Sequence, residues 1–283
     1  MLFGLDVPAT VDREADQADL AETAERLDLD FVSINDHLLD SGPRYEAWTL
    51  LTWLAASTLR IRVVSRVLGV PFRHPVLLAK MGESLDRLSG GRFTLGLGAG
   101  SGEREFAAMG LRSGSIRERV EALEETMRIL RGLWSGDTLT FDGRFHTIAE
   151  ARLEPKPAHA IPIWLGTVGP RGLELTGRLA DGWIPSLAYA PPERAPAMIQ
   201  VIQSAAERAG RDPGRLELIY NLELAFGDQS STGAVCGTPD AIVRQLRSFL
   251  DAGFTGFNFQ LRDPDWHMAA EKLAADVIPA LTG

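Results

Sequence analysis

The feature of this chain that most constrains its fold is a regular alternation of short apolar runs with longer amphipathic stretches. Apolar runs bounded by turn residues predict strands, and stretches with an apolar residue at every third or fourth position predict helices. The predicted strands cover residues 2–7, 30–35, 61–68, 92–97, 162–166, 182–186, 216–226 and 255–260, and the predicted helices cover residues 16–27, 48–59, 76–88, 116–134, 171–180, 193–209, 240–252 and 266–281. Strands that are each followed by a helix pair in parallel through right-handed crossovers, and eight such units close a barrel. We therefore expect an α/β chain folded as one (β/α)8 TIM barrel over residues 1–283.

The composition fits a barrel and excludes several classes of protein. The chain has 283 residues, and a TIM barrel typically needs about 250. The net charge is −9 and the basic residues form no stripe with interleaved aromatics, so we expect no nucleic-acid partner. No apolar stretch reaches the ~18 residues of a membrane span, and no signal-peptide pattern precedes the first predicted strand. The single cysteine, Cys236, permits no intramolecular disulfide, which favours a cytoplasmic protein without a membrane partner.

One stretch, between the fourth and fifth predicted strands, breaks the alternation. It has about sixty residues, where a plain βα unit needs roughly thirty. The excess falls in residues 101–115 and 135–161, and Asp142-Gly143 between two apolar runs predicts a β-hairpin. Long excursions on barrel loops usually shape an active site, although a surface decoration is the alternative.

Polar residues that follow the second and third predicted strands are candidates for chemistry, because barrel active sites lie at the C-terminal ends of strands. Asp36 and His37 come directly after the second strand, and histidine is the side chain best suited to proton transfer near neutral pH. The alternative is that Asp36 caps a loop and His37 is a solvated turn residue. Arg73 and His74 follow the third strand, where surface and helix-entry positions explain them at least as well.

Two glycine-rich loops follow the fourth and fifth predicted strands. Gly98-Ala99-Gly100 lies in the first loop and Gly166-Thr167-Val168-Gly169 in the second, directly before a helix. Small residues let the backbone approach a ligand, and free amides at a helix N-terminus bind anions. Ordinary tight turns are the alternative for either loop alone, but together they predict one phosphate site. The spacing of the first loop does not fit a Rossmann dinucleotide fingerprint.

Other common sites have no support in the sequence. The five histidines show no pairing with metal-ligand spacing, so we expect no metal. No Gly-x-Ser-x-Gly nucleophile elbow is present. Trp164 and Trp183 lie within strands and are expected in the core. The substrate pocket is expected to be lined by large side chains from loops and neighbouring elements: Trp48, Phe106, Trp183, Tyr189 and Trp266.

Several segments of the chain, taken in order, resemble the luciferase-like monooxygenase superfamily and, within it, the deazaflavin-dependent branch. They are DLDFVSINDH at 28–37, VLGVPFRHPVLLAK at 67–80, LSGGRFTLGLGAG at 88–100, PIWLGTVGP at 162–170 and GRLADGWIP at 177–185. The resemblance implies a barrel with an insertion after strand four, coenzyme F420 as cofactor and a homodimer. It implies that Asp36 and His37 lie beside the ring, and that Gly98, Ala99, Gly100, Thr167, Val168 and Gly169 offer amides to the phosphate.

The resemblance also implies a non-prolyl cis peptide bond at the end of strand three, where Ser65, Arg66 and Val67 would support the ring, with Gly166 close by. Arg66 stands where a small residue is usual. Ser101 stands where sugar-phosphate dehydrogenases of the family place a glutamate, so that substrate is not assigned. Ala99 stands where bacterial luciferase has an arginine that meets the flavin phosphate, which favours deazaflavin.

The function implied by the resemblance is hydride transfer between C5 of the deazaflavin and a small organic substrate, with His37 orienting the substrate or moving its proton and Asp36 fixing the site. One alternative is a monooxygenase that uses reduced flavin mononucleotide (FMN) and oxygen. A second alternative is a barrel that binds a flavin without catalysis.

Overall fold

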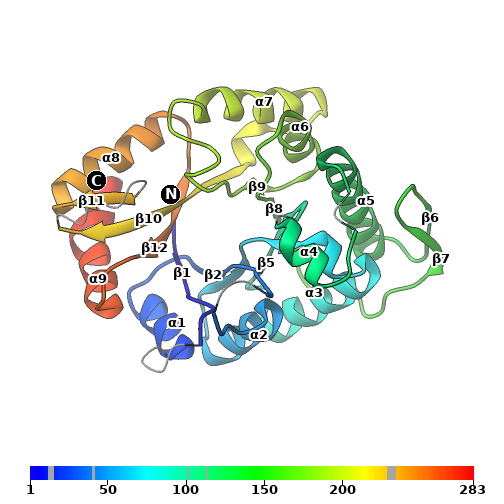
Figure 1. Ribbon diagram of the computed structural model, residues 1–283, viewed down its shortest axis with the longest axis horizontal. Coiled ribbons are helices and arrows are strands. Elements are labelled where there is room, and N and C mark those ends of the chain that lie inside the picture. The colour runs from blue at the N-terminus through cyan, green and yellow to red at the C-terminus, as the bar shows by residue number, and fades with distance from the viewer. Residues whose placement is uncertain (12–15, 40–41, 101, 113, 228–233) are drawn as a thin grey trace.

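Parallel strands close into a barrel because each one pairs with the next and β10 pairs with both β9 and β12 (Figure 1). The computed structural model describes residues 1–11, 16–39, 42–100, 102–112, 114–227 and 234–283. The barrel strands are β1 (Leu2–Asp6), β2 (Phe31–Ile34), β3 (Arg62–Ser65), β5 (Phe93–Gly98), β8 (Ile163–Leu165), β9 (Gly182–Trp183), β10 (Glu217–Phe226) and β12 (Gly256–Leu261). The predicted (β/α)8 architecture is therefore confirmed.

Helices surround the strands as an outer ring (Figure 1). They are α1 (Gln17–Arg26), α2 (Ala47–Ser57), α3 (Pro75–Ser89), α5 (Ile116–Ser135), α6 (Pro170–Leu179), α7 (Ala195–Arg208), α8 (Pro239–Asp251) and α9 (Trp266–Lys272). The predicted last helix is divided, because α9 leads into a π-helical turn at Leu273–Val277 and then α10 (Ile278–Thr282). Within the described ranges, no helix combines the length and the apolarity needed to cross a membrane.

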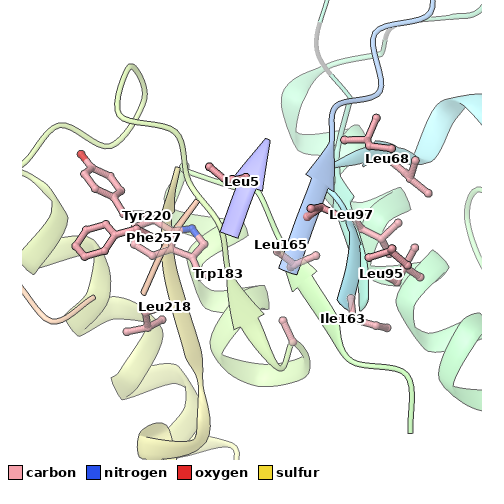
Figure 2. Close-up of a cluster of buried hydrophobic side chains, with 14 of the residues drawn as sticks. Leu5, Leu68, Leu95, Leu97, Ile163, Leu165, Trp183, Leu218, Tyr220 and Phe257 are labelled. Atoms are coloured by element: carbon pink, nitrogen blue, oxygen red, sulfur yellow. The ribbon is translucent and has the colours of Figure 1, made fainter. Parts of the chain in front are cut away.

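The core has two layers because side chains of a barrel strand point alternately inward and outward. Phe31, Val64, Trp164 and Ile184 form one buried cluster with Ile219, which lies on β10. A second layer packs between the strands and the helices, and Figure 2 shows part of it, including Leu95, Leu97, Leu165, Trp183 and Phe257. Trp164 and Trp183 are both fully buried, as their positions in strands predicted.

The insertion after β5 contains the expected hairpin. It begins with a short helix, α4 (Glu103–Ala108), continues through α5 and then forms the antiparallel strands β6 (Leu139–Asp142) and β7 (Thr147–Ala151). The Glu125 carboxylate on α5 accepts backbone N–H bonds from Arg144, Phe145 and His146, so the hairpin turn is held against α5. Ser101, the first residue of the predicted insertion, lies outside the described residues.

Two features of the strands differ from the sequence prediction. The predicted third strand, 61–68, is interrupted: β3 ends at Ser65, and the chain resumes as β4 (Leu68–Gly69), which pairs with β5. An additional strand, β11 (Ala234–Gly237), pairs in parallel with β10 beside the barrel. Its apolar run is too short to show a periodicity, which is why the sequence pattern did not reveal it.

Candidate active site

A cavity of about 1320 Å³ opens at the C-terminal ends of the barrel strands. Its lining comes from the loops after β2, β3, β5, β8 and β9, and from the ends of β10 and β12. Of the site residues predicted from sequence, all but one line this cavity: Asp36, His37, Arg66, Val67, Gly98, Ala99, Gly100, Gly166, Thr167, Val168 and Gly169. The fold thus brings the acid-base candidates and both glycine-rich loops into one space.

The exception is Ser65, which joins two strands beneath the cavity. Its hydroxyl donates to the Gly96 carbonyl at 3.0 Å and accepts from the Gly96 N–H at 2.9 Å. The side chain is 1% exposed, so it is not available to a ligand. Ser65 therefore fixes the spacing of β3 and β5 from within the barrel wall.

The peptide bond between Arg66 and Val67 is cis, as the resemblance implied. Val67 then lies against two glycines of the neighbouring strands. A Cβ atom on Gly98 would stand 2.7 Å from a Val67 methyl carbon, and one on Gly166 would stand 3.0 Å from it. Glycine is therefore required at Gly98 for steric reasons, and Val67 forms part of the cavity floor.

A polar network lies below this floor, at the top of the barrel interior. The Arg66 guanidinium contacts Asp6 Oδ1 at 2.9 Å, and the side chains are 12% and 1% exposed. Buried polar groups need such partners, because an unpaired charge in the interior is costly. From Asp6, side-chain hydrogen bonds continue across the barrel through Ser33, Asn258, Asn221 and Ser186. The large residue at position 66 is thus accommodated by a counterion on β1.

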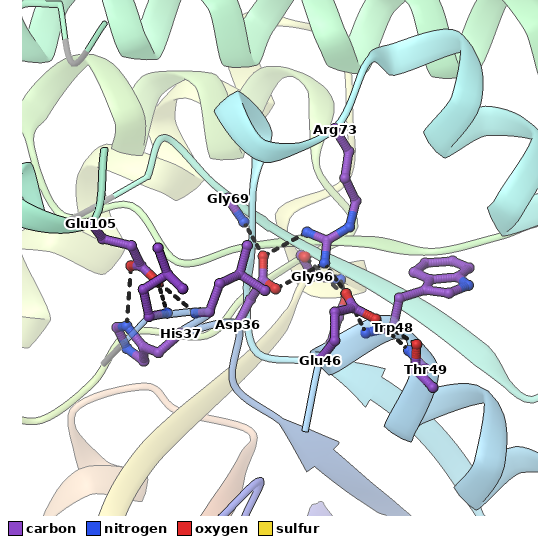
Figure 3. A network of polar contacts seen from close by, with 12 residues as sticks. Asp36, His37, Glu46, Trp48, Thr49, Gly69, Arg73, Gly96 and Glu105 are labelled. Carbon is purple, nitrogen blue, oxygen red and sulfur yellow. Dashed lines mark hydrogen bonds and ion pairs between the residues drawn. The ribbon is translucent and has the colours of Figure 1, made fainter. Parts of the chain in front are cut away.

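Asp36 is fully engaged by two partners from the segment after β3 (Figure 3). Arg73 donates to both carboxylate oxygens, at 2.7 and 2.9 Å, and the Gly69 N–H donates to Oδ2 at 3.0 Å. The Asp36 side chain has no exposed surface, and that of Arg73 is 9% exposed. Arg73 is therefore no surface residue, and the alternative reading of it from the sequence is wrong. His74 accepts from the Val76 N–H at the start of α3, as a helix-entry residue does.

Arg73 also links Asp36 to Glu46, which begins α2. Burial raises the pKa of Glu46, but hydrogen bonds from the Thr49 and Trp48 amides and from Arg73 outweigh it, and the pKa is lowered overall. Burial likewise disfavours the charged form of Arg73, but its two carboxylate partners raise the pKa of the guanidinium. Glu46 and Arg73 are held in their charged forms, and this network ties the loop after β2 to α2 and α3.

His37 lies at the cavity edge, and its side chain is 48% exposed. Its Nδ1 atom is 3.9 Å from Oε2 of Glu105, a residue of α4. The Asp36 carboxylate is turned toward Arg73 (Figure 3). The carboxylate beside the imidazole is therefore that of Glu105 in the insertion.

Free backbone amides and positive charge meet where the starts of α5 and α6 line the cavity. Gly169 is the N-cap of helix α6 and provides no side-chain cap, so the N–H groups that follow Pro170 in the first turn remain available to an anion. Among the described lining residues are five arginines (Arg44, Arg66, Arg117, Arg119 and Arg171) and two carboxylates (Asp36 and Glu223). The Arg119 Nε atom is buried without a partner among the described residues. Arg66 is paired with Asp6, and Arg117 and Arg171 are paired with Glu121, so the positive group best placed to meet an anionic ligand is Arg119.

Residues 3–232 match the family of luciferase-like monooxygenases. The chain belongs to this family. A relative that is 31% identical over 229 residues, covering 79% of this chain and 67% of its own, is the F420-dependent glucose-6-phosphate dehydrogenase of Nakamurella multipartita. Another, 33% identical over 75% of this chain and 59% of its own, is the F420-dependent hydroxymycolic acid dehydrogenase of Mycobacterium tuberculosis.

A solved structure with the same fold is an F420-dependent secondary alcohol dehydrogenase in complex with an F420-acetone adduct. It superposes with a TM-score of 0.89 at 21% identity, over 99% of this chain and 98% of that one. This chain therefore shares the fold of that structure over nearly its whole length.

For this luciferase-like chain, the sequence prediction of the aromatic lining is mostly wrong. Only Tyr189 of the predicted set lines the cavity. Phe106 and Trp183 are fully buried, and Trp48 packs its ring against Phe93 at 5.5 Å. Large apolar side chains near the barrel mouth are used as core, and smaller residues and arginines line the space instead.

Arg117, Arg119 and Arg171 were not predicted as site residues in this luciferase-like barrel. They lie in the first turns of α5 and α6, and the fold places both helix starts at the cavity. The sequence feature that could have indicated them is their place at helix starts. Arg117 and Arg119 follow the first part of the insertion, and Arg171 follows the second glycine-rich loop.

Proposed function

We propose that this chain is a coenzyme F420-dependent oxidoreductase that transfers hydride between C5 of the deazaflavin and a carbon of a small organic substrate. The observation that carries the proposal is one cavity that combines a phosphate cradle, a positive lining and His37, in a chain whose relatives include F420-dependent dehydrogenases. The bound deazaflavin would supply the hydride acceptor or donor, and the protein would supply position and proton transfer.

The residues present fit the anionic end of such a cofactor. Gly98, Ala99 and Gly100 would face the phosphate from one side, and the start of α6 with Thr167, Val168 and Gly169 from the other. Amides at a helix start and an arginine side chain both favour phosphate. Arg66, Val67 and Gly166 would form the floor on which the ring is held.

His37 would orient the substrate oxygen and give or accept its proton, since its imidazole titrates near neutral pH, lines the cavity and is half-exposed. Asp36 would act indirectly, because its carboxylate is occupied by Arg73 and Gly69. Its role is to fix the position of the loop that carries His37.

The proposed reaction is tested by mixing purified protein with oxidised F420 and a panel of alcohols, and with reduced F420 and the matching carbonyl compounds. We expect a change in deazaflavin absorbance with at least one substrate. Oxygen consumption with reduced FMN, together with no turnover of the deazaflavin, would instead establish the monooxygenase. Binding of the cofactor without turnover of any substrate would favour the non-catalytic barrel.

We also propose that the chain works as a homodimer that uses α2 and α3. These neighbouring helices expose Trp53, Leu77 and Leu88, whose surfaces are 61%, 56% and 80% exposed in the single chain. Light scattering after size exclusion should give twice the 30.8 kDa mass of one chain for the wild type. The double variant Trp53→Asp/Leu77→Glu should give the mass of a single chain. A wild-type protein that runs at the mass of one chain would refute the dimer.

A further inference from the structure

The side chain of Glu105 connects α4 of the insertion to the loop that carries His37. Its Oε1 atom accepts the backbone N–H groups of Leu38 and Leu39, the latter at 2.9 Å. Its Oε2 atom faces Nδ1 of His37 at 3.9 Å. The side chain is only 9% exposed, so these contacts are made away from bulk water (Figure 3).

The helix that carries Glu105 is itself fixed by its neighbour in sequence. Phe106 is fully buried and packs its ring 5.6 Å from that of Phe72, in the segment after β4. Its ring tip also occupies the space beside Gly100, where an added Cβ would come within 2.7 Å. Helix α4 therefore rests on the loops after β4 and β5 while Glu105 reaches the loop after β2.

The neighbouring carboxylate of Asp36 does not orient the imidazole of His37. Asp36 is directed to Arg73 and Gly69 with both oxygens occupied. In the part of the chain that the structure describes, the carboxylate in contact with a ring nitrogen of His37 is that of Glu105. A carboxylate that faces one ring nitrogen favours an orientation of the imidazole in which the other nitrogen is left for a ligand.

We propose that Glu105 is a positioning residue for His37: by binding the Leu38 and Leu39 amides and facing Nδ1, it fixes the imidazole at the cavity edge. The proposal rests on the proposed catalytic role of His37 and deepens it. It also gives the insertion a function, because α4 would couple the cofactor loop at Gly100 to the acid-base residue. Hydrogen bonds from two successive amides to a carboxylate hold the loop more firmly than the 3.9 Å contact with His37 alone.

The position of His37 can be measured without cofactor or substrate. In protein labelled at its five histidines, the His37 ring signal is identified by its loss in His37→Gln. We expect Glu105→Ala to shift that signal and to leave the signals of the other four in place. An unmoved His37 signal in Glu105→Ala would overturn the proposal, whatever reaction the enzyme catalyses.

Measurements of kcat then distinguish a Glu105 that positions His37 from a Glu105 that transfers the proton itself. Glu105→Ala should lower kcat roughly a hundredfold, because a displacement of about 1 Å at a reacting group costs that much. Glu105→Gln keeps an oxygen that accepts both amides, so it should recover most of the loss. If Gln is as slow as Ala, the carboxylate acts directly and the positioning role is wrong. Arg104→Ala, on the exposed face of the same helix, is the matched control and should leave kcat unchanged.

A double variant tests whether Glu105 acts through His37. Adding Glu105→Ala to His37→Ala should cause no further loss of kcat, whereas independent roles would multiply the losses. Should Glu105→Ala fold poorly in thermal melts, Glu105→Asp serves instead, since its shorter side chain cannot reach both amides. If the ring signal responds to these variants but no deazaflavin turnover is found in the wild type, the positioning inference stands and the proposed function fails.

Discussion

Replacing His37 by alanine is expected to lower kcat by about 10²- to 10⁴-fold, the range that a general acid or base usually contributes. The imidazole lies at the cavity edge, half-exposed, and takes no part in the core. The cofactor loops lie on other strands, so the affinity for deazaflavin should change little. Steady-state kinetics and a deazaflavin titration on the same preparation measure the two quantities separately.

His267→Ala is the matched control for this experiment. His267 pairs with Asp19 on the outer surface between α9 and α1 and does not line the cavity. Its replacement should leave kcat unchanged. Full activity in His37→Ala would contradict the acid-base role and would require another proton donor at the cavity.

Replacing Arg73 by alanine is expected to lower the free energy of unfolding by about 3–5 kcal/mol, the cost of leaving a buried charge without its partner. The Asp36 side chain has no exposed surface, and Arg73 supplies two of its hydrogen bonds. Arg73→Lys should recover only part of the stability, because an ammonium group cannot donate in parallel to both oxygens. Urea denaturation followed by circular dichroism measures the difference.

Arg208→Ala provides the comparison with an exposed pair. Arg208 and Glu174 lie 3.8 Å apart with side chains 64% and 56% exposed, and such pairs contribute at most about 1 kcal/mol. Equal stability losses in Arg73→Ala and Arg208→Ala would show that the network around Asp36 does not hold the barrel mouth together.

The sequence predicted the barrel because apolar residues are spaced differently in strands and in helices. Each βα unit of the barrel shows both spacings in turn. It also predicted the cavity walls, because residues that follow parallel strands meet at one end of the barrel. Asp36, His37 and the loops at Gly98 and Gly166 were found by that rule alone. The cis bond at Arg66 came from the family resemblance and has no signal in the residue types themselves.

The rest of the site depends on contacts between loops, which no periodicity records. Asp36 and Arg73 are 37 residues apart, and their pairing requires the segment after β4 to fold back over the loop after β2. The sequence placed Arg73 after the third strand but gave no indication that it would pair with Asp36. Helix α4 is only six residues long, so its pattern gave no sign that Glu105 would reach His37.

The central claim is that this luciferase-like barrel uses a deazaflavin, and a spectroscopic titration of the purified protein tests it most directly. Coenzyme F420 and FMN are added separately to the same preparation, and fluorescence reports the bound fraction of each. The account predicts saturable binding of F420 that is tighter than that of FMN, and weaker binding of F420 after Arg119→Ala at the positive wall of the cavity. Tight binding of FMN with no binding of F420 would contradict it.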